Sequence, residues 1–224
     1  MLDSYRFLCE VSLKIPGAQR ITGKPAYMRI FWYYLGLGVF LLAIYACARR
    51  NEKHKDCRET ADLCVSRRKK RLQGIVFSCF IAFLLLFLLF PQKKSFEIDF
   101  LDVGQGDGIY LCTGNGVAMF VDGGSTDIKN VGQYRILPFL KAKGVRKISC
   151  WFVSHTDTDH VSGLKEVLVS GYRVEYLVFA KAVEKEAKTK ELAELARSHG
   201  TKVLYMQAGD TVRSKRAAMR CLYP

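Results

Sequence analysis

Two long runs of apolar residues lie in the first 90 positions of the chain and contain no charged side chain. Residues 30–48 form the first run, and residues 74–90 form the second. At about 1.5 Å per residue, each run gives a helix roughly 25–29 Å long, close to the roughly 30 Å hydrocarbon thickness of a bilayer. A helix that is apolar on every side belongs in lipid or in a large protein core. We therefore expect two transmembrane helices, with a buried helical hairpin as the alternative.

The connection between the two runs, residues 49–73, is strongly basic. It carries ten Lys or Arg residues against four Asp or Glu residues. The positive-inside rule places such a loop in the cytoplasm, so that residues 1–29 and everything after residue 90 lie on the extracytoplasmic side of the cell membrane. This predicts a multi-pass protein. A solvated charged loop explains the basic cluster, and binding to nucleic acid or lipid is the alternative.

A different pattern begins after residue 90. Apolar and polar residues alternate over residues 96–100, which predicts a strand. Two further predicted strands flank Gly114-Asn115-Gly116, a strong hairpin signal. Helical patterns then alternate with strands: the helices are 133–143, 161–169 and 182–198, and the strands are 148–153, 174–179 and 203–206. This order predicts an α+β domain over residues 91–224, in which helices cover a sheet.

Composition adds a positive charge and argues against cysteine chemistry. The 224 residues have a formal net charge of +14. Residues 91–224 carry 20 Lys or Arg residues against 15 Asp or Glu residues, and this mild positive charge favours an anionic partner, for example nucleic acid. The eight cysteines are scattered and form no Cys-x-x-Cys pair, so that neither a disulfide-stapled fold nor a thiolate zinc site is indicated. Any two of Cys112, Cys150 and Cys221 could pair outside the cell.

The loop after the strand 148–153 concentrates residues that can bind metal. His155, Asp157, Asp159 and His160 lie within six positions. In extended backbone His155 and Asp157 point the same way, and a turn into the next helix brings Asp159 and His160 together. The spacing predicts two divalent ions, one at each pair, that together bind a hydroxide and a phosphoryl or acyl oxygen. The alternative is that Asp157 and Asp159 only cap the following helix.

The sequence His-x-Asp-x-Asp-His resembles the metal signature of the metallo-β-lactamase fold, whose usual form is His-x-His-x-Asp-His. Asp157 stands in place of the middle histidine, as in the ComEC-type DNA-internalisation proteins of natural competence. A carboxylate at this position makes the site harder, and manganese and zinc are the leading candidates. The other segments that carry the resemblance are residues 101–107 (LDVGQGD), 121–124 (VDGG), 137–140 (LPFL) and Gly163-Leu164.

The resemblance implies a partial αββα sandwich and a membrane-anchored hydrolase that uses metal-bound hydroxide to cleave the phosphodiester bonds of DNA. Single-stranded DNA, membrane lipid and the remainder of a membrane channel are the implied partners. Asp159 is the expected catalytic residue beside the metal ligands His155, Asp157 and His160. The residues expected to line the cleft or to orient these ligands are Asp102, Gln105, Asp107, Asp122, Gly123, Gly124 and Ser154.

The family pattern also includes a later Thr-Gly-Asp segment and further histidines, which the sequence does not contain. We therefore expect a fragment with weak or no activity. Gly209-Asp210 is interpreted as a turn between short strands, and His199 as a solvated residue at a helix end. Two alternatives are a truncated, non-enzymatic membrane remnant and a hydrolase of the same fold that acts on small esters.

Overall fold

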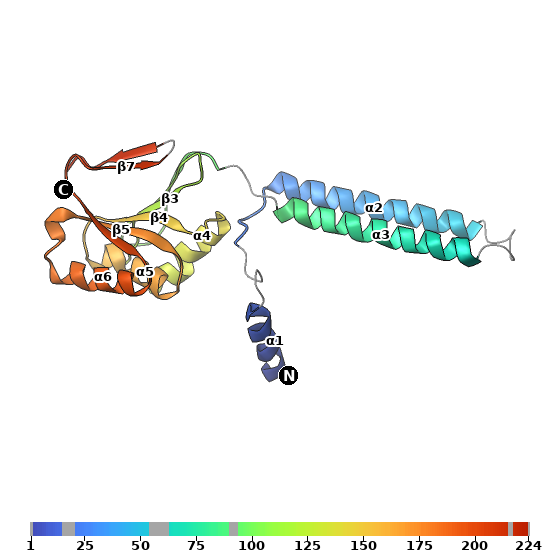
Figure 1. Cartoon of the computed structure of the whole chain (residues 1–224), viewed down its shortest axis with the longest axis horizontal. Coiled ribbons are helices and arrows are strands. Elements are labelled where there is room, and N and C mark those ends of the chain that lie inside the picture. The colour runs from blue at the N-terminus through green and yellow to red at the C-terminus, as the bar shows by residue number, and fades with distance from the viewer. Residues whose placement is uncertain (1, 15–20, 54–62, 90–93, 215–216, 224) are drawn as a thin grey trace. The chain divides into compact units, whose positions relative to one another are not determined.

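The computed structural model describes residues 2–14, 21–53, 63–89, 94–214 and 217–223 (Figure 1). The chain forms two compact units. One comprises residues 25–92, and the other comprises residues 1–24 together with residues 93–224. Each unit is described by itself.

The unit of residues 25–92 is a pair of long helices, α2 (Tyr27–Lys53) and α3 (Leu63–Leu89). Phe40 of α2 stacks on Phe77 and Phe80 of α3, with ring centroids 5.4 and 4.2 Å apart. Residues Tyr27–Ala46 of α2 are long and apolar enough to cross a membrane, and Gly74–Leu88 of α3 is a shorter apolar stretch. The second predicted membrane span therefore stays a prediction.

Both helices continue past the apolar runs into the basic connection. Residues 49–53 extend α2, and residues 63–73 begin α3, although a loop was expected over 49–73. Lys and Arg are good helix formers, so a charged sequence does not end a helix when no Gly or Pro interrupts it. The middle of the connection, residues 54–62, lies outside the described residues.

The second unit contains a six-stranded sheet in the order β1-β2-β3-β4-β5-β6. The first three strands are antiparallel, and β3 to β6 are parallel. Their bounds are β1 Glu97–Phe100, β2 Gly108–Cys112, β3 Ala118–Asp122, β4 Ile148–Val153, β5 Val174–Ala180 and β6 Lys202–Met206. The predicted hairpin at Gly114-Asn115-Gly116 joins β2 to β3. This mixed sheet confirms the α+β class.

Helices cover one face of the sheet, and a short hairpin lies on the other (Figure 1). The helical segments are η2 (Gly132–Ile136), α4 (Leu137–Ala142), α5 (Thr158–Val169), η3 (Lys181–Val183) and α6 (Ala187–Ser198); the hairpin is β7 (Thr211–Ser214) and β8 (Ala217–Arg220). The predicted helix 133–143 begins as a π-helix, and the predicted helix 182–198 begins with a 3₁₀ turn before α6. An αββα sandwich remains a prediction.

The N-terminal part of this unit contains α1 (Leu2–Lys14) and a short segment that is fixed to the end of α4. The amide of Lys24 donates to the carbonyl of Ala142 over 2.6 Å, and Arg146 Nε donates to the carbonyl of Ile21 over 3.2 Å. Residues 21–24 thus belong to the sheet unit by contact, although they precede the first predicted membrane span in the sequence.

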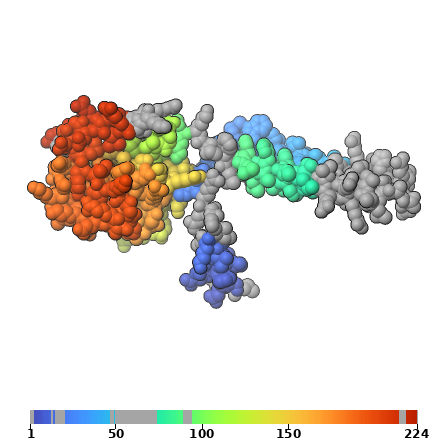
Figure 2. Space-filling model, viewed as in Figure 1, coloured from blue at the N-terminus to red at the C-terminus, as the bar shows by residue number. Residues whose placement is uncertain are grey.

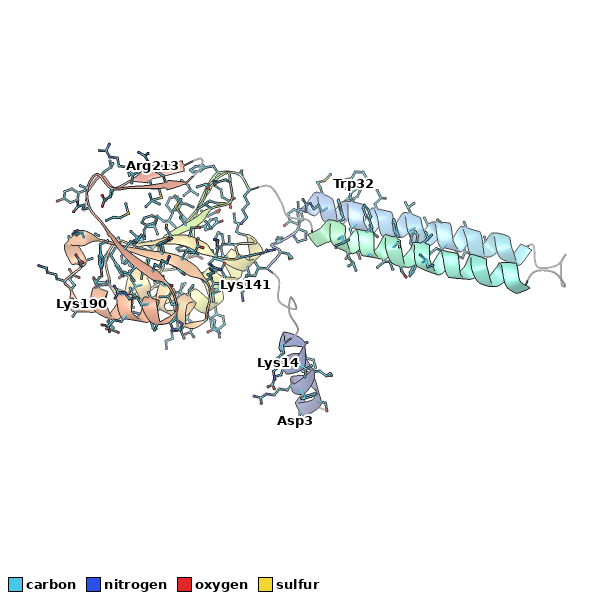
Figure 3. All side chains as sticks on the ribbon, viewed as in Figure 1. Asp3, Lys14, Trp32, Lys141, Lys190 and Arg213 are labelled. Atoms are coloured by element: carbon cyan, nitrogen blue, oxygen red, sulfur yellow. The ribbon has the colours of Figure 1, made fainter. Side chains whose placement is uncertain are left out.

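The main core fills the layer between the sheet and α4, α5 and α6 (Figure 3). Trp151 and Phe120 are fully buried at its centre, with ring centroids 4.5 Å apart. On the other face, Met119, Cys150 and Val178 pack against side chains of the β7–β8 hairpin, which lies on the surface in the space-filling view (Figure 2). Cys112 belongs to the first core and Cys150 to the second, and both thiols are free.

Candidate metal centre

The predicted metal loop lies where two parallel strands end. Strand β3 pairs with β4 in the register Val121 to Phe152, so that the residues after each strand emerge side by side. The segment after β4 runs from Ser154 to Asp157 and enters α5 at Thr158. Ligands commonly bind in the crevice beyond the carboxyl ends of parallel strands. The topology therefore brings Asp122 of β3 to the His155–His160 segment.

Two glycines allow the backbone segments around this loop to approach closely. A Cβ atom on Gly124 would lie 2.5 Å from the amide nitrogen of His160, and one on Gly106 would lie 2.6 Å from the carbonyl oxygen of Asp159. The amide of Asp107 donates to the carbonyl of Asp159, and the amide of Gly124 donates to the carbonyl of Asp107, both over 3.2 Å. These two glycines are therefore required by the close approach of the backbone segments.

Asp122 holds the metal loop in place. Its carboxylate accepts hydrogen bonds from the amide and the hydroxyl of Ser154, each over 2.8 Å. The Trp151 indole N–H donates to the Asp122 carbonyl over 2.6 Å. Asp122 is buried and has a φ of 56°, a left-handed conformation that is uncommon for residues other than glycine. Such strain persists only where the surrounding contacts enforce it, as they do here.

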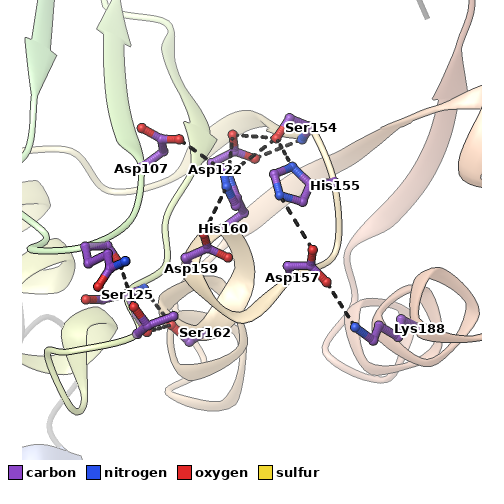
Figure 4. Close-up of polar contacts among 12 residues, drawn as sticks. Asp107, Asp122, Ser125, Ser154, His155, Asp157, Asp159, His160, Ser162 and Lys188 are labelled. Atoms are coloured by element: carbon purple, nitrogen blue, oxygen red, sulfur yellow. Dashed lines mark hydrogen bonds and ion pairs between the residues drawn. The ribbon is translucent and has the colours of Figure 1, made fainter.

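Two groups of side chains converge on His160 (Figure 4). One ligand atom from each of His155, Asp159 and His160 lies within 4.8 Å of the others, and the same holds for Asp107, Asp122 and His160. His160 Nδ1 lies 3.1 Å from Asp122 Oδ2, and His160 Nε2 lies 3.5 Å from Asp159 Oδ2. The two imidazole rings have centroids 3.6 Å apart.

The donor chemistry suits a divalent ion at the first of these groups. The Asp122 carboxylate is hydrogen-bonded to Ser154 and lies against His160 Nδ1. The other ring nitrogen, His160 Nε2, is directed toward Asp159 and is available to a cation. A carboxylate that binds the far nitrogen of a metal-ligating histidine fixes its tautomer and orientation. Two imidazole nitrogens and one carboxylate oxygen form a ligand set that zinc and manganese accept. His155, Asp159 and His160 thus fit the ion, with Asp122 as the orienting carboxylate.

Asp157 lies beside this group, between His155 and Lys188 (Figure 4). Its Oδ1 lies 3.0 Å from Lys188 Nζ on α6, and its Oδ2 lies 3.9 Å from His155 Nε2. The hydrogen bond and charge of Lys188 lower the pKa of Asp157 and raise the pKa of Lys188. Asp157 also occupies the N-cap position of α5, without a capping hydrogen bond from its side chain. Both predicted pairs are in contact, since His155 lies against Asp157 and Asp159 lies 3.5 Å from His160, but Asp157 belongs to neither converging group. Binding of one ion at each pair stays a prediction.

The remaining predicted site residues have different positions. Asp102 is exposed and lies 3.5 Å from Arg135, outside both groups. Gln105 and Gly123 contribute backbone hydrogen bonds: the amide of Gln105 donates to Asp127 over 2.8 Å, and the carbonyl of Gly123 accepts from Leu164 over 3.0 Å. These bonds fix the loops around the site.

Two contributors were missed by the sequence interpretation. Lys188 follows Asp157 by 31 positions, and Lys190 on the same helix carries the same charge, so that no local signal distinguishes Lys188. Asp127 accepts hydrogen bonds from the Ser125 hydroxyl and the Gln105 amide, which lower its pKa. Its place three residues after the segment Val121-Asp122-Gly123-Gly124 was the available clue.

No protein-family model matches this chain. It is 26% identical over 178 residues to ComE operon protein 3 of Bacillus subtilis, a match that covers 72% of this chain and 23% of that protein. It is 34% identical over 107 residues to Recombination protein 2 of Haemophilus influenzae, covering 46% of this chain and 13% of that protein. The chain thus spans less than a quarter of the length of these relatives. The two similarities support the resemblance to a competence family.

Proposed function

We propose that this chain is the membrane-anchored, metal-dependent hydrolase part of a DNA-uptake protein, and that it cleaves phosphodiester bonds of single-stranded DNA on the extracytoplasmic side. The observation that carries the proposal is the convergence of His155, Asp159 and His160 at the ends of two parallel strands. The similarity to two competence-related proteins supports the choice of DNA as the substrate. Membrane lipid and the remainder of a channel are the further proposed partners.

In this proposal each side chain of the cluster has a separate task. His155 and His160 hold the ion through imidazole nitrogens, and Asp159 contributes a carboxylate oxygen. When bound, a divalent ion at this position activates water and polarises a phosphoryl oxygen. Asp159 is 37% exposed, so that its carboxylate is open to solvent and can take a proton from an attacking water. Asp122 keeps the His160 ring in one orientation through the contact at Nδ1.

The direct test is cleavage of labelled single-stranded DNA by the full chain in detergent, with Mn²⁺ or Zn²⁺ added. We expect slow, metal-dependent cleavage that His160→Ala abolishes. His199→Ala is the matched control, because His199 ends α6 and lies outside both converging groups. Cleavage of a nitrophenyl ester without cleavage of DNA would replace the proposal with the small-ester hydrolase. Stoichiometric metal without any turnover would favour the non-enzymatic remnant.

The membrane arrangement is tested separately. We expect that alkaline phosphatase fused after Lys94 is active and that the same enzyme fused within residues 54–62 is inactive, because alkaline phosphatase folds only where its disulfides form. The reverse result would place the sheet unit in the cytoplasm and remove extracytoplasmic DNA as its substrate.

A further inference from the structure

Lys188 lies where the sequence spacing predicts half of a second cation site. His155 and Asp157 were expected to hold one ion and Asp159 and His160 the other, but the structure groups His155 with Asp159 and His160. The second group, Asp107, Asp122 and His160, contains the Asp122 carboxylate that is hydrogen-bonded to Ser154. Asp157 lies between His155 and Lys188, which extends toward it from α6 (Figure 4). The ammonium group is 3.0 Å from Asp157 Oδ1, within hydrogen-bonding distance. A positive charge of the chain itself is therefore located next to the carboxylate that the sequence spacing assigned to a second metal ion.

We propose that the site binds one divalent ion and that Lys188 supplies the second positive charge for the phosphate of the DNA substrate. The inference rests on the proposed function and specifies how its site is built. In a two-metal site, the second ion neutralises charge on the oxygens of the phosphoryl group. A lysine ammonium can do the same as a compact point charge with three donors.

The exposure of the ion pair allows this exchange of partners. The side chains of Lys188 and Asp157 are 69% and 61% exposed, so that neither is locked in place by packing. An exposed ion pair contributes little to stability, which makes its rearrangement on substrate binding inexpensive in free energy. A phosphate oxygen bound at the ion can thus take the place of Asp157 as the partner of Lys188.

The metal content of the full chain in detergent tests the number of ions. After dialysis against Mn²⁺ and removal of free metal, we expect one Mn²⁺ per chain in the wild type, one in Lys188→Ala and none in His160→Ala. Two ions in the wild type would overturn the inference and leave the proposed hydrolase intact. No bound metal would overturn the proposed function itself.

Binding of a phosphorothioate oligothymidylate to the Mn²⁺-loaded chain tests the role of Lys188. We expect Lys188→Ala to weaken binding about 10-fold, the usual effect of losing a charge-assisted hydrogen bond, while Lys188→Arg retains most of it. Lys190→Ala is the control, because Lys190 is exposed on the same helix and its substitution removes one positive charge, as Lys188→Ala does (Figure 3). Equal losses in Lys188→Ala and Lys190→Ala would overturn the inference, since they would indicate only a general electrostatic effect. Since the metal content is measured on the same samples, loss of the ion would be recognised separately.

Discussion

The helical hairpin and the sheet unit place similar side chains in opposite surroundings. Leu42 and Phe31 of α2 are 68% and 56% exposed, whereas Trp151 and Phe120 of the sheet are fully buried. An apolar surface of this kind is typical of a helix that lies in a bilayer, and residues Tyr27–Ala46 of α2 are long and apolar enough to cross one. The sheet unit carries its own core between β-strands and helices, and its polar cluster lies at the ends of the strands. Apolar residues on the surface of α2 are thus suited to contact with lipid, whereas apolar residues of the sheet unit form the core that supports the polar cluster.

The largest expected difference between the two regions is in the effect of truncating one large apolar residue to alanine. Trp151→Ala removes the contact with Phe120 and the hydrogen bond to the Asp122 carbonyl. We expect a loss of about 3–5 kcal/mol in the free energy of unfolding of the sheet unit. Leu42→Ala is expected to change it by less than about 0.5 kcal/mol. Urea unfolding of the full chain in detergent, followed by circular dichroism, measures both; similar losses would contradict the comparison.

The same comparison can be made with glycine. Gly124→Ala forces a methyl group against the backbone of residues 158–160, whereas Gly38 of α2 has nothing within 4 Å of its added Cβ. We expect Gly124→Ala to destabilise the sheet unit by about 1–3 kcal/mol and to weaken Mn²⁺ binding, because the metal loop must shift. Gly38→Ala is expected to cause no loss, since alanine favours helix. Thermal unfolding measures the stability of both variants, and titration measures their affinity for Mn²⁺. Equal stability and equal affinity in Gly124→Ala and Gly38→Ala would contradict the prediction.

A smaller effect is expected where a side chain orients a ligand without binding the ion. Asp122→Asn keeps the size of the residue but removes the charge beside His160 Nδ1. We expect Mn²⁺ affinity to fall about 10–100-fold, the usual result of losing such a partner. Asp102→Asn is the matched control, because Asp102 lies with Arg135 outside the cluster. Calorimetric titration with Mn²⁺ distinguishes the two, and an equal response would exclude Asp122 as the orienting residue.

The smallest expected effect is a shift in the pKa of one carboxyl group, that of Asp157. Lys188 holds the pKa of Asp157 below its ordinary value. The ion pair therefore stabilises the fold above that ordinary value, and the contribution is lost as the pH falls through the lowered pKa. In the metal-free protein, Lys188→Ala should return the pKa of Asp157 toward its ordinary value, as measured by NMR of the carboxyl carbon. The lowered pKa of Asp127, caused by Ser125, should stay unchanged; a shift of both would indicate a wider rearrangement.

Much of the fold could be predicted from local patterns. The Gly114-Asn115-Gly116 turn and the apolar run of β4 were identified correctly from a few neighbouring residues. The alternation around Ile98 also identified strand β1, although Ile98 and Phe100 are 46% and 78% exposed, so that burial of these side chains is not what forms the strand. The limits of α2 and α3 could not be predicted from apolarity, because charged residues extend a helix as readily as apolar ones. The π-helical start of the 133–143 segment depends on packing against α5, where Gly132 meets the carbonyl of Gly163.

The sequence by itself determined which residue types are available: four metal-capable side chains after a buried strand, and two apolar runs before it. Only the tertiary structure decided their grouping. The parallel pairing of β3 with β4 brings Asp122 to His160, and the position of α6 brings Lys188 to Asp157. Spacing along the chain fixes the direction of neighbouring side chains, but contacts across 31 or more positions depend on how strands and helices pack.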